Sequence, residues 1–358
     1  MDTLIVKKNR CEYLDIARGM AIILVVLGHS IQSNIMDMDS SLVFRIIYSF
    51  HMPLFMFISG AVTAFIKKDS INLSWLVKRF FTLIIPFVAW IFVPYIFVSH
   101  TFPVKEIAQK IIRIIKSPDW GLWFLYVLFI QDCLLVILFC LEKLIKLNFA
   151  FFVIPLYYVL KLIPRLGFHY LGMSLIIGHY KFFMGGVLMY SIGLKYLRCL
   201  GKKVLYLGLS FMSVFFILSV RYWNRVGQPF FVNSERFSAI PQNMQMSFIN
   251  LYRLCVPFCG IAFIILCSVL MSRYMNFGVL NIIKKVVVYL GTITLEIYAV
   301  HFYCFGFIGG LANKHIEIIA DFMVAVFMSV AVCELLKGCI LYKLLFGKLN
   351  VFSDKKRN

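Results

Sequence analysis

Apolar runs of about 20 residues alternate with short polar segments along nearly the whole chain. A helix needs a run of this length to cross the hydrocarbon core of a bilayer, whereas a membrane barrel shows short segments of alternating polarity. The pattern predicts an all-α polytopic membrane protein, a bundle of about ten transmembrane helices. The expected spans are residues 13–32, 43–66, 76–98, 120–141, 149–164, 174–194, 204–220, 251–271, 286–309 and 319–342.

Composition agrees with this pattern and narrows the possible partners. The chain has 358 residues, of which 62% are hydrophobic, and its mean hydropathy of +0.89 excludes a soluble globular domain. A net charge of +20 in a soluble protein would suggest nucleic acid as a partner. In a membrane protein, basic cytoplasmic loops explain the charge, so we expect the lipid bilayer and no nucleic acid as a partner.

The loop charges also predict an orientation. If the N-terminus is placed in the cytoplasm, most Lys and Arg residues of the loops fall on the inner side. Both termini are therefore expected to be cytoplasmic. We divide the chain into one membrane domain, residues 1–346, and a basic cytoplasmic tail, residues 347–358.

The segments between the spans contain two unusual stretches. Residues 104–117 have the spacing of a basic amphipathic helix, which we expect on the outer membrane surface. Residues 221–250 form the longest polar stretch, and they are either a simple connection or a surface that meets a sugar. The ten cysteines are scattered without a CxxC pair or a Cys/His cluster, so we expect neither a metal site nor a disulfide framework.

The first span carries three ionisable residues, Asp15, Arg18 and His29, within an apolar run. Such residues are costly in a membrane helix and usually functional. At about 100° and 1.5 Å per residue, Arg18 and His29 lie on one stripe about 16 Å apart, and Asp15 lies one turn before Arg18. This stripe suits a long anionic ligand whose charged head meets Arg18 and whose reactive tip reaches His29. In the alternative interpretation, Asp15 and Arg18 form an interfacial ion pair and His29 makes a buried polar contact.

Two further spans carry polar side chains that could join His29. In the second span, His51 precedes Pro53, which should kink or restart the helix, and Ser59-Gly60 permits a close helix approach. His51 is either a partner of His29 in one cavity or an interfacial residue at a helix start. In the ninth span, Glu296 and His301 lie within an apolar run, and a buried glutamate needs a partner such as a histidine or an arginine.

Two pairs of residues flank other spans. Lys78 and Arg79 open the third span at the expected cytoplasmic face, where they either bind a phosphate or anchor the helix. Trp120 and Trp123 open the fourth span at the expected outer face, where tryptophans anchor helices and also stack on sugar rings.

Five motifs in this order carry a resemblance to a known family. They are LDIARGMAIILVVLGH, FHMPLFMFISG, KRFFTLIIPF, WGLWFL and LGTITLEIYAVH. Together they resemble the membrane acyltransferase-3 family over essentially the full length, and most of all its fucose 4-O-acetylase-like branch. The spacing of Arg18 and His29 matches the first-helix motif of the family. Many relatives carry a second arginine shortly after the position of Arg79, where this chain has Phe80, Phe81 and Thr82.

The resemblance implies a bacterial cytoplasmic (inner) membrane enzyme that moves an acyl group, usually acetyl from acetyl-CoA, to a hydroxyl of a polysaccharide, lipopolysaccharide or lipid-linked sugar. Acetyl-CoA is then a donor substrate, and no permanently bound cofactor or metal is expected. His29 is the implied essential histidine and Arg18 its partner on the donor path. His29 acts either as a general base or as a nucleophile that carries the acetyl group.

The remaining candidates complete the expected site. Glu296 or Asp15 orients or balances the charge of the histidine or arginine. Lys78 and Arg79 are candidates for donor binding, together with Arg18. The candidates for acceptor binding are His51, Trp120, Trp123 and His301.

A transporter or flippase of a lipid-linked glycan is the main alternative, because buried ionisable residues also line translocation paths. Transporters often contain inverted repeats, and we find no internal repeat in the sequence. A sensor or scaffold would leave the buried charges unexplained. Consumption of a thioester by the purified protein separates the enzyme from both alternatives.

Overall fold

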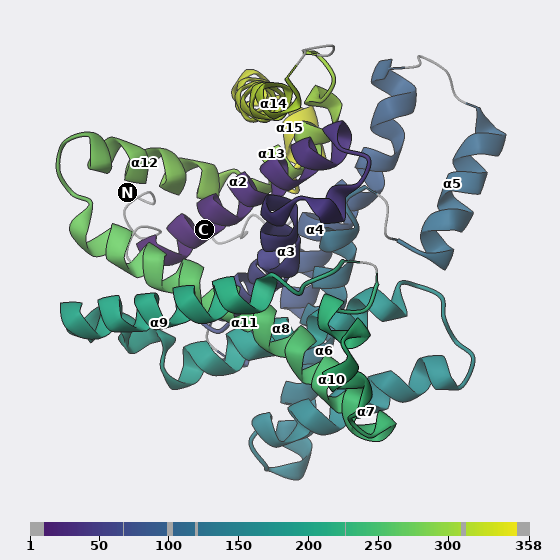
Figure 1. Cartoon of the computed structure of the whole chain (residues 1–358). Coiled ribbons are helices and arrows are strands. Elements are labelled where there is room, and N and C mark those ends of the chain that lie inside the picture. The colour runs from purple at the N-terminus through teal and green to yellow at the C-terminus, as the bar shows by residue number, and fades with distance from the viewer. Residues whose placement is uncertain are drawn as a thin grey trace. The chain divides into compact units, whose positions relative to one another are not determined.

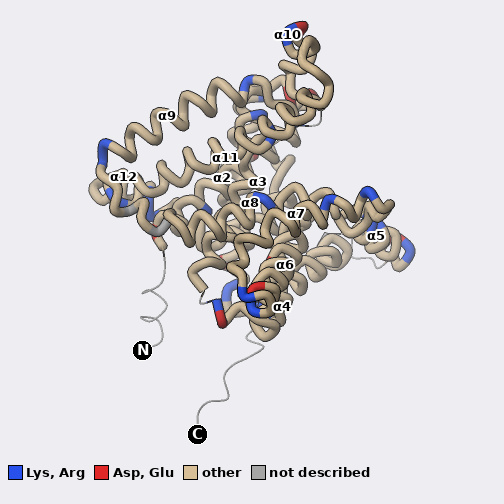
Figure 2. Tube along the Cα trace, turned by 90° about the horizontal axis from the view of Figure 1, so that it is seen from below, with Lys and Arg blue, Asp and Glu red and all other residues tan. Residues whose placement is uncertain are grey.

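The computed structural model describes residues 11–66, 68–98, 103–118, 121–225, 227–308 and 313–348. Residues 349–358, most of the expected basic tail, lie outside this set. The described residues contain helices and no strand, which confirms the all-α fold class. Long stretches of helix carry neither Lys or Arg nor Asp or Glu, as expected for segments that lie in lipid (Figure 2).

Among the described residues, eight helices are long and apolar enough to cross a membrane, and a ninth span results if one bent pair is counted. The bent pair joins α12 (Gly278–Thr292) to α13 (Thr294–Val300) and its short continuation with a bend of 72°. The segment expected to be the fifth span forms a helix, α7 (Ala150–Arg165), of only 16 residues. The chain is thus a polytopic helical membrane protein, and its helical pair α12–α13 is bent close to Glu296 and His301.

The chain forms two compact units, which we describe separately. The first unit contains the described residues up to Ile58 and those of Gly193–Val330. Its helices are α2 (Glu12–Asn34), the first part of α3 (Leu42–Thr63), α9 (Lys202–Val220), α10 (Glu235–Ser238), α11 (Gln242–Tyr274), α12 (Gly278–Thr292), α13 (Thr294–Val300) and most of α14 (Lys314–Leu336). The short helical turns of this unit are η1 (Met38–Ser40), η4 (Leu194–Cys199), η5 (Phe230–Asn233) and η6 (His301–Cys304).

The second unit contains Ser59–Ile192 and the described residues from Ala331 onward. In it α4 packs on α6 and α15, and α8 packs on α6 and α7. Its helices are α4 (Leu73–Val93), α5 (Val104–Lys116), α6 (Trp123–Ile145), α7 (Ala150–Arg165), α8 (Met173–Ile192) and α15 (Ile340–Leu345), with the turns η2 (Lys68–Ser70) and η3 (Pro94–Val98). Residues 104–116 form the predicted basic helix.

The helix α2 is the centre of the first unit. It packs against α11, α12 and α13, and Figure 1 shows α12 alongside it. Two-thirds of its apolar window is buried by protein, a larger share than in any other candidate span. The helix that contains Asp15, Arg18 and His29 is therefore the most buried of the eight candidate spans.

Two glycines set the distance between α2 and α12. A Cβ atom at Gly291 would lie 2.0 Å from the carbonyl oxygen of Asp15, and one at Gly19 would lie 2.0 Å from that of Val287. Small residues of this kind let helix backbones approach in a membrane, where packing replaces the hydrophobic effect as the driving force. The crossing places Gly291 beside the turn of α2 that contains Asp15 and Arg18.

The second span departs from one expectation and confirms another. Pro53 lies inside α3, which continues from Leu42 to Thr63 without a restart, so His51 is a residue of the helix interior and not of its start. Within the second unit, a Cβ at Gly60 would lie 2.0 Å from the carbonyl oxygen of Phe183. The close approach predicted from Ser59-Gly60 is thus made by Gly60 against α8.

We expect Gly291→Ala to destabilise the protein by about 1–3 kcal/mol, because the new methyl group overlaps the backbone of α2. Gly178→Ala in α8 is the matched control, since a Cβ there meets nothing within 4 Å and alanine favours a helix over glycine. The midpoint of thermal unfolding in detergent should fall for the first variant and not for the second. Equal midpoints would contradict the close crossing.

Candidate functional site

The predicted stripe of α2 contains an ion pair at its N-terminal end. Nη1 of Arg18 lies 3.8 Å from Oδ1 of Asp15, one turn earlier. The Asp15 side chain is 7% exposed, whereas that of Arg18 is 30% exposed. The ion pair considered from the sequence therefore exists, and the Arg18 side chain stays partly exposed.

His29 lies near the C-terminal end of α2, and its ring is fixed through Nδ1. Nδ1 is 3.1 Å from Oε1 of Gln32 and 3.3 Å from the hydroxyl of Tyr48. The Tyr48 hydroxyl donates to the same Gln32 oxygen at 2.6 Å. Because an amide oxygen only accepts, Nδ1 of His29 carries the proton in this arrangement, and Nε2 carries the free lone pair.

Local sequence explains how Tyr48 reaches this position. A Cβ at Gly28 would lie 3.0 Å from Cε2 of Tyr48, so the glycine before His29 makes room for the ring. Tyr48 also stacks on Phe44, with 4.0 Å between ring centroids. The Gly28-His29 pair of α2 and the Tyr48 turn of α3 thus form one packing unit.

A second histidine lies beside the first. The ring centroids of His29 and His301 are 5.3 Å apart, and Phe302 packs on both rings. Nδ1 of His301 is 3.0 Å from the carbonyl oxygen of Ile297, so this nitrogen is the donor. Nε2 of His301 is buried and has no hydrogen-bond partner among the described residues. Two imidazoles with an unprotonated Nε2 therefore lie together in the first unit.

The other predicted residues of this unit lie around the pair. His51 is buried, its Nδ1 donates to the carbonyl oxygen of Ile47 at 2.9 Å, and its ring is 4.6 Å from that of Tyr48. Tyr48 thus links His51 to His29. Glu296 is 1% exposed on α13, the short helix that leads to His301 and packs on α2. Its pairing with a histidine or arginine stays a prediction.

Arg225, which the sequence analysis did not single out, also lies at this site. Its guanidinium carbon is 4.9 Å from the centroid of the Tyr48 ring. The residue belongs to the long polar stretch 221–250, which the sequence predicts to be either a simple connection or a surface that meets a sugar. Only the length and polarity of that stretch indicated a role, because no spacing rule relates residue 225 to residue 48.

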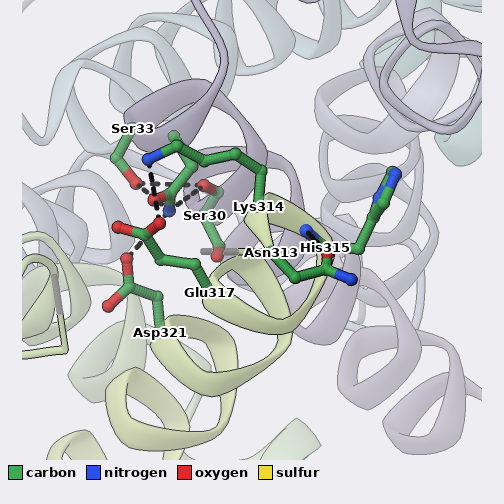
Figure 3. Close-up of polar contacts among 8 residues, drawn as sticks. Ser30, Ser33, Asn313, Lys314, His315, Glu317 and Asp321 are labelled. Carbon is green, nitrogen blue, oxygen red and sulfur yellow. Dashed lines mark hydrogen bonds and ion pairs between the residues drawn. The ribbon is translucent and has the colours of Figure 1, made fainter. Parts of the chain in front are cut away.

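A buried acidic cluster near the end of α2 was also missed. Asp321 accepts a hydrogen bond from Nδ2 of Asn34 at 2.8 Å, and Glu317 pairs with Lys314 at 2.8 Å. In Figure 3, Glu317 and Asp321 of α14 face Ser30 and Ser33 of α2, while His315 points away. The hydroxyl of Ser30 donates to the carbonyl oxygen of Ile318 at 2.7 Å. These contacts hold α14 against the turn that carries His29.

The predicted donor-binding pair belongs to the second unit. Nε of Arg79 donates to Oδ2 of Asp132 at 2.7 Å, and the Asp132 side chain is fully buried. Arg79 also lies over the ring of Trp75, whereas Lys78 is exposed. Asp132 was missed although it interrupts the apolar run of the fourth span, which is the usual mark of a functional or paired residue.

The predicted aromatic residues of the fourth span are only partly described. Trp123 packs against His179 within the second unit, with ring centroids 5.1 Å apart, and its contact with a sugar stays a prediction. Trp120 lies outside the described residues. In the described ranges, no three His, Cys, Asp or Glu side chains are grouped so as to hold a metal ion.

Comparison with known proteins identifies the family. The family described as "Acyltransferase domain" matches residues 12–337. The nodulation protein NolL of Mesorhizobium japonicum is 29% identical over 143 residues, which are 38% of this chain and 38% of that protein. NolL of Sinorhizobium fredii is 50% identical over 56 residues, which are 14% of this chain and 15% of that protein.

These two alignments span well under half the length of either relative. No solved structure matches the chain. The family match, in contrast, runs from the start of α2 to the end of α14 and includes both histidines of the site. The chain belongs to the acyltransferase-3 family of polytopic membrane proteins.

Proposed function

We propose that the protein is an O-acyltransferase of the bacterial cytoplasmic membrane that moves an acetyl group from acetyl-CoA to a hydroxyl of a cell-surface glycan. Family membership supports the acyl transfer. The observation that carries the assignment to a site is the 3.1 Å contact of Nδ1 of His29 with Oε1 of Gln32, from which we infer that the proton lies on Nδ1 and the lone pair on Nε2. Acetyl-CoA is a substrate here, and the proposal needs no bound cofactor.

In this mechanism His29 is the general base. Its Nε2 takes the proton of the acceptor hydroxyl while the hydroxyl oxygen attacks the thioester carbonyl carbon. The C–S bond then breaks and CoA leaves as a thiolate, which is protonated by the imidazolium. The alternative sequence, in which Nε2 first takes the acetyl group, would produce an acetyl-histidine that mass spectrometry of the protein can detect.

His301 acts as a positioning residue for the acceptor. Its buried Nε2 lacks a donor, and a buried acceptor left unpaired costs about 1–3 kcal/mol. A second hydroxyl of the sugar would satisfy it and hold the reacting hydroxyl beside His29, 5.3 Å away between ring centroids.

The donor is bound through its phosphates. Arg18, partly exposed at the N-terminal end of α2, is suited to meet the anionic head of CoA, and the helix rise gives about 16 Å between it and His29. A pantetheine arm spans such a length. With both termini in the cytoplasm, acetyl-CoA enters from the cytoplasmic side, and Lys78 and Arg79 are further candidates for its phosphates.

Replacement of His29 should abolish acetylation. In a host strain that lacks the gene, His29→Ala should restore less than about 1% of the O-acetyl groups of the surface glycan, because general bases contribute about 10²- to 10⁴-fold. His315→Ala, an exposed histidine of α14 that points away, should restore them fully. Mass spectrometry of the glycan gives the result, and normal acetylation by membrane-inserted His29→Ala would refute the role of His29.

Substitutions of Gln32 test whether the proton of the His29 ring lies on Nδ1. Gln32→Leu removes the acceptor of the Nδ1 proton and should lower kcat about 10-fold, in line with the loss of one hydrogen bond. Gln32→Glu keeps an acceptor oxygen and should retain most of the activity. The KM for acetyl-CoA should stay unchanged in both variants. Equal kcat values for Gln32→Leu and wild type would show that Nδ1 does not need this partner.

The ion pair of Arg79 and Asp132 complicates any test of the donor site. Arg79→Ala leaves a fully buried carboxylate without its partner, and such losses cost about 3–5 kcal/mol. We therefore expect little folded Arg79→Ala protein in membranes, whereas Arg79→Met combined with Asp132→Leu should restore its abundance. Fluorescence-detected size-exclusion chromatography measures both. Wild-type abundance of the single variant would mean that the pair is not structurally required.

The double variant then tests donor binding. If Arg79 contacts a CoA phosphate, the KM for acetyl-CoA should rise about 10-fold or more, which corresponds to a hydrogen bond to a charged group. An unchanged KM would remove Arg79 from the donor site and leave Arg18 and Lys78 as the candidates.

A further inference from the structure

We infer that the acceptor glycan carries a negative charge, a carboxylate or a phosphate, close to the hydroxyl that is acetylated, and that Arg225 recognises it. This inference rests on the proposed function and specifies its substrate class. It starts from the polar connection between α9 and α11. We call residues 221–225 and 227–229 of this connection the arginine loop.

Two helices hold the arginine loop in place. Nη1 of Arg45, on α3, donates to the carbonyl oxygen of Arg221 at 2.7 Å. Nη2 of Arg253, on α11, donates to the carbonyl oxygen of Gly227 at 2.6 Å. Both ends of the loop are thus tied to helices of the first unit by charged donors, which form stronger hydrogen bonds than neutral ones.

Arg225 lies between these two anchors. Its backbone N–H donates to Oδ1 of Asp39 at 3.3 Å, on the connection that follows α2. Its exposed side chain extends over Tyr48, with the guanidinium carbon 4.9 Å from the ring centroid. The hydroxyl of that ring contacts Nδ1 of His29. The loop therefore places the guanidinium of Arg225 at the edge of the site formed by His29 and His301.

The arginine side chains in and around the arginine loop have no carboxylate partner among the described residues. Arg45, Arg221, Arg225 and Arg253 each lie over an aromatic ring, and in the described part of the chain no carboxylate lies within 4.0 Å of any of them. Asp39 meets the loop through a backbone N–H. Four arginine side chains without a carboxylate partner in the described ranges make this part of the first unit attractive to an anion.

The role of Arg45 and Arg253 differs from that of Arg225. Arg45 and Arg253 each donate a hydrogen bond from a guanidinium nitrogen to a carbonyl oxygen of the loop, so they hold the loop in place. Arg225 has its guanidinium over Tyr48, beside the proposed general base. A guanidinium pairs with carboxylate and phosphate through parallel N–H donors. An anionic group on the acceptor would meet Arg225 while a neighbouring hydroxyl reaches Nε2 of His29.

The test uses full-length protein in nanodiscs, acetyl-CoA, and the O-deacetylated surface glycan of the host. One glycan sample stays untreated, a second has its carboxyl groups reduced to hydroxymethyl groups, and a third has its phosphates removed with hydrogen fluoride. For wild type, one of the two treatments should raise the KM for glycan about 10-fold, and which treatment does so identifies the anion. If neither does, the inference is wrong.

Variants of Arg225 test whether this residue recognises the anionic group of the glycan. Arg225→Gln should raise the KM for untreated glycan about 10-fold with kcat unchanged, and it should act on neutralised glycan like wild type. Arg225→Lys should recover part of the loss. Arg236→Gln, an exposed arginine of α10 in the same polar stretch, is the matched control and should behave like wild type.

Failure of the inference differs from failure of the proposed function. A variant Arg225→Gln with a wild-type KM for untreated glycan, or with an equal loss of kcat on all three glycans, would overturn the role of Arg225 while acetyl transfer persists. If wild-type protein consumes no acetyl-CoA with any glycan, the proposed function itself is wrong, and the inference falls with it.

Discussion

The hydrogen bond between Nδ1 of His29 and Oε1 of Gln32 determines what the site can do. Both residues lie on α2, one turn apart, so the helix itself supplies the geometry. Tyr48 of α3 donates to the same oxygen and so fixes the amide in the orientation that accepts. With the proton held on Nδ1, Nε2 is left as a base or nucleophile.

The rest of the first unit keeps this helix in place. Gly19 and Gly291 bring α12 onto the N-terminal part of α2. Two acceptors of α14 hold its C-terminal part: the Asp321 carboxylate accepts from Asn34, and the carbonyl oxygen of Ile318 accepts from Ser30. The break between α12 and α13 turns the chain by 72°, after which His301 lies beside His29. A straight ninth span would lack this bend, and broken helices in membranes usually line a site.

Sequence reasoning recovered the fold class and the first-helix stripe because both depend on local periodicity. The apolar runs indicated the helices, and the cost of charge in lipid singled out Arg18, His29, Glu296 and His301. Local patterns could not show that Pro53 leaves α3 unbroken, since tertiary packing decides how a helix accommodates a proline. Nor could they find Asp132 opposite Arg79 or Arg225 over Tyr48. Both contacts join segments far apart in the chain, and only the folded structure brings them together.

We propose that this membrane protein transfers an acyl group from a thioester to a glycan. The most direct measurement incubates purified protein in nanodiscs with acetyl-CoA and the O-deacetylated host glycan, and counts free CoA thiol and new acetyl esters in the same sample. We expect both to rise together in equal amounts and neither to rise without the protein. Intact acetyl-CoA, with the glycan unmodified but moved across the membrane of a sealed vesicle, would instead identify a transporter and refute acyl transfer.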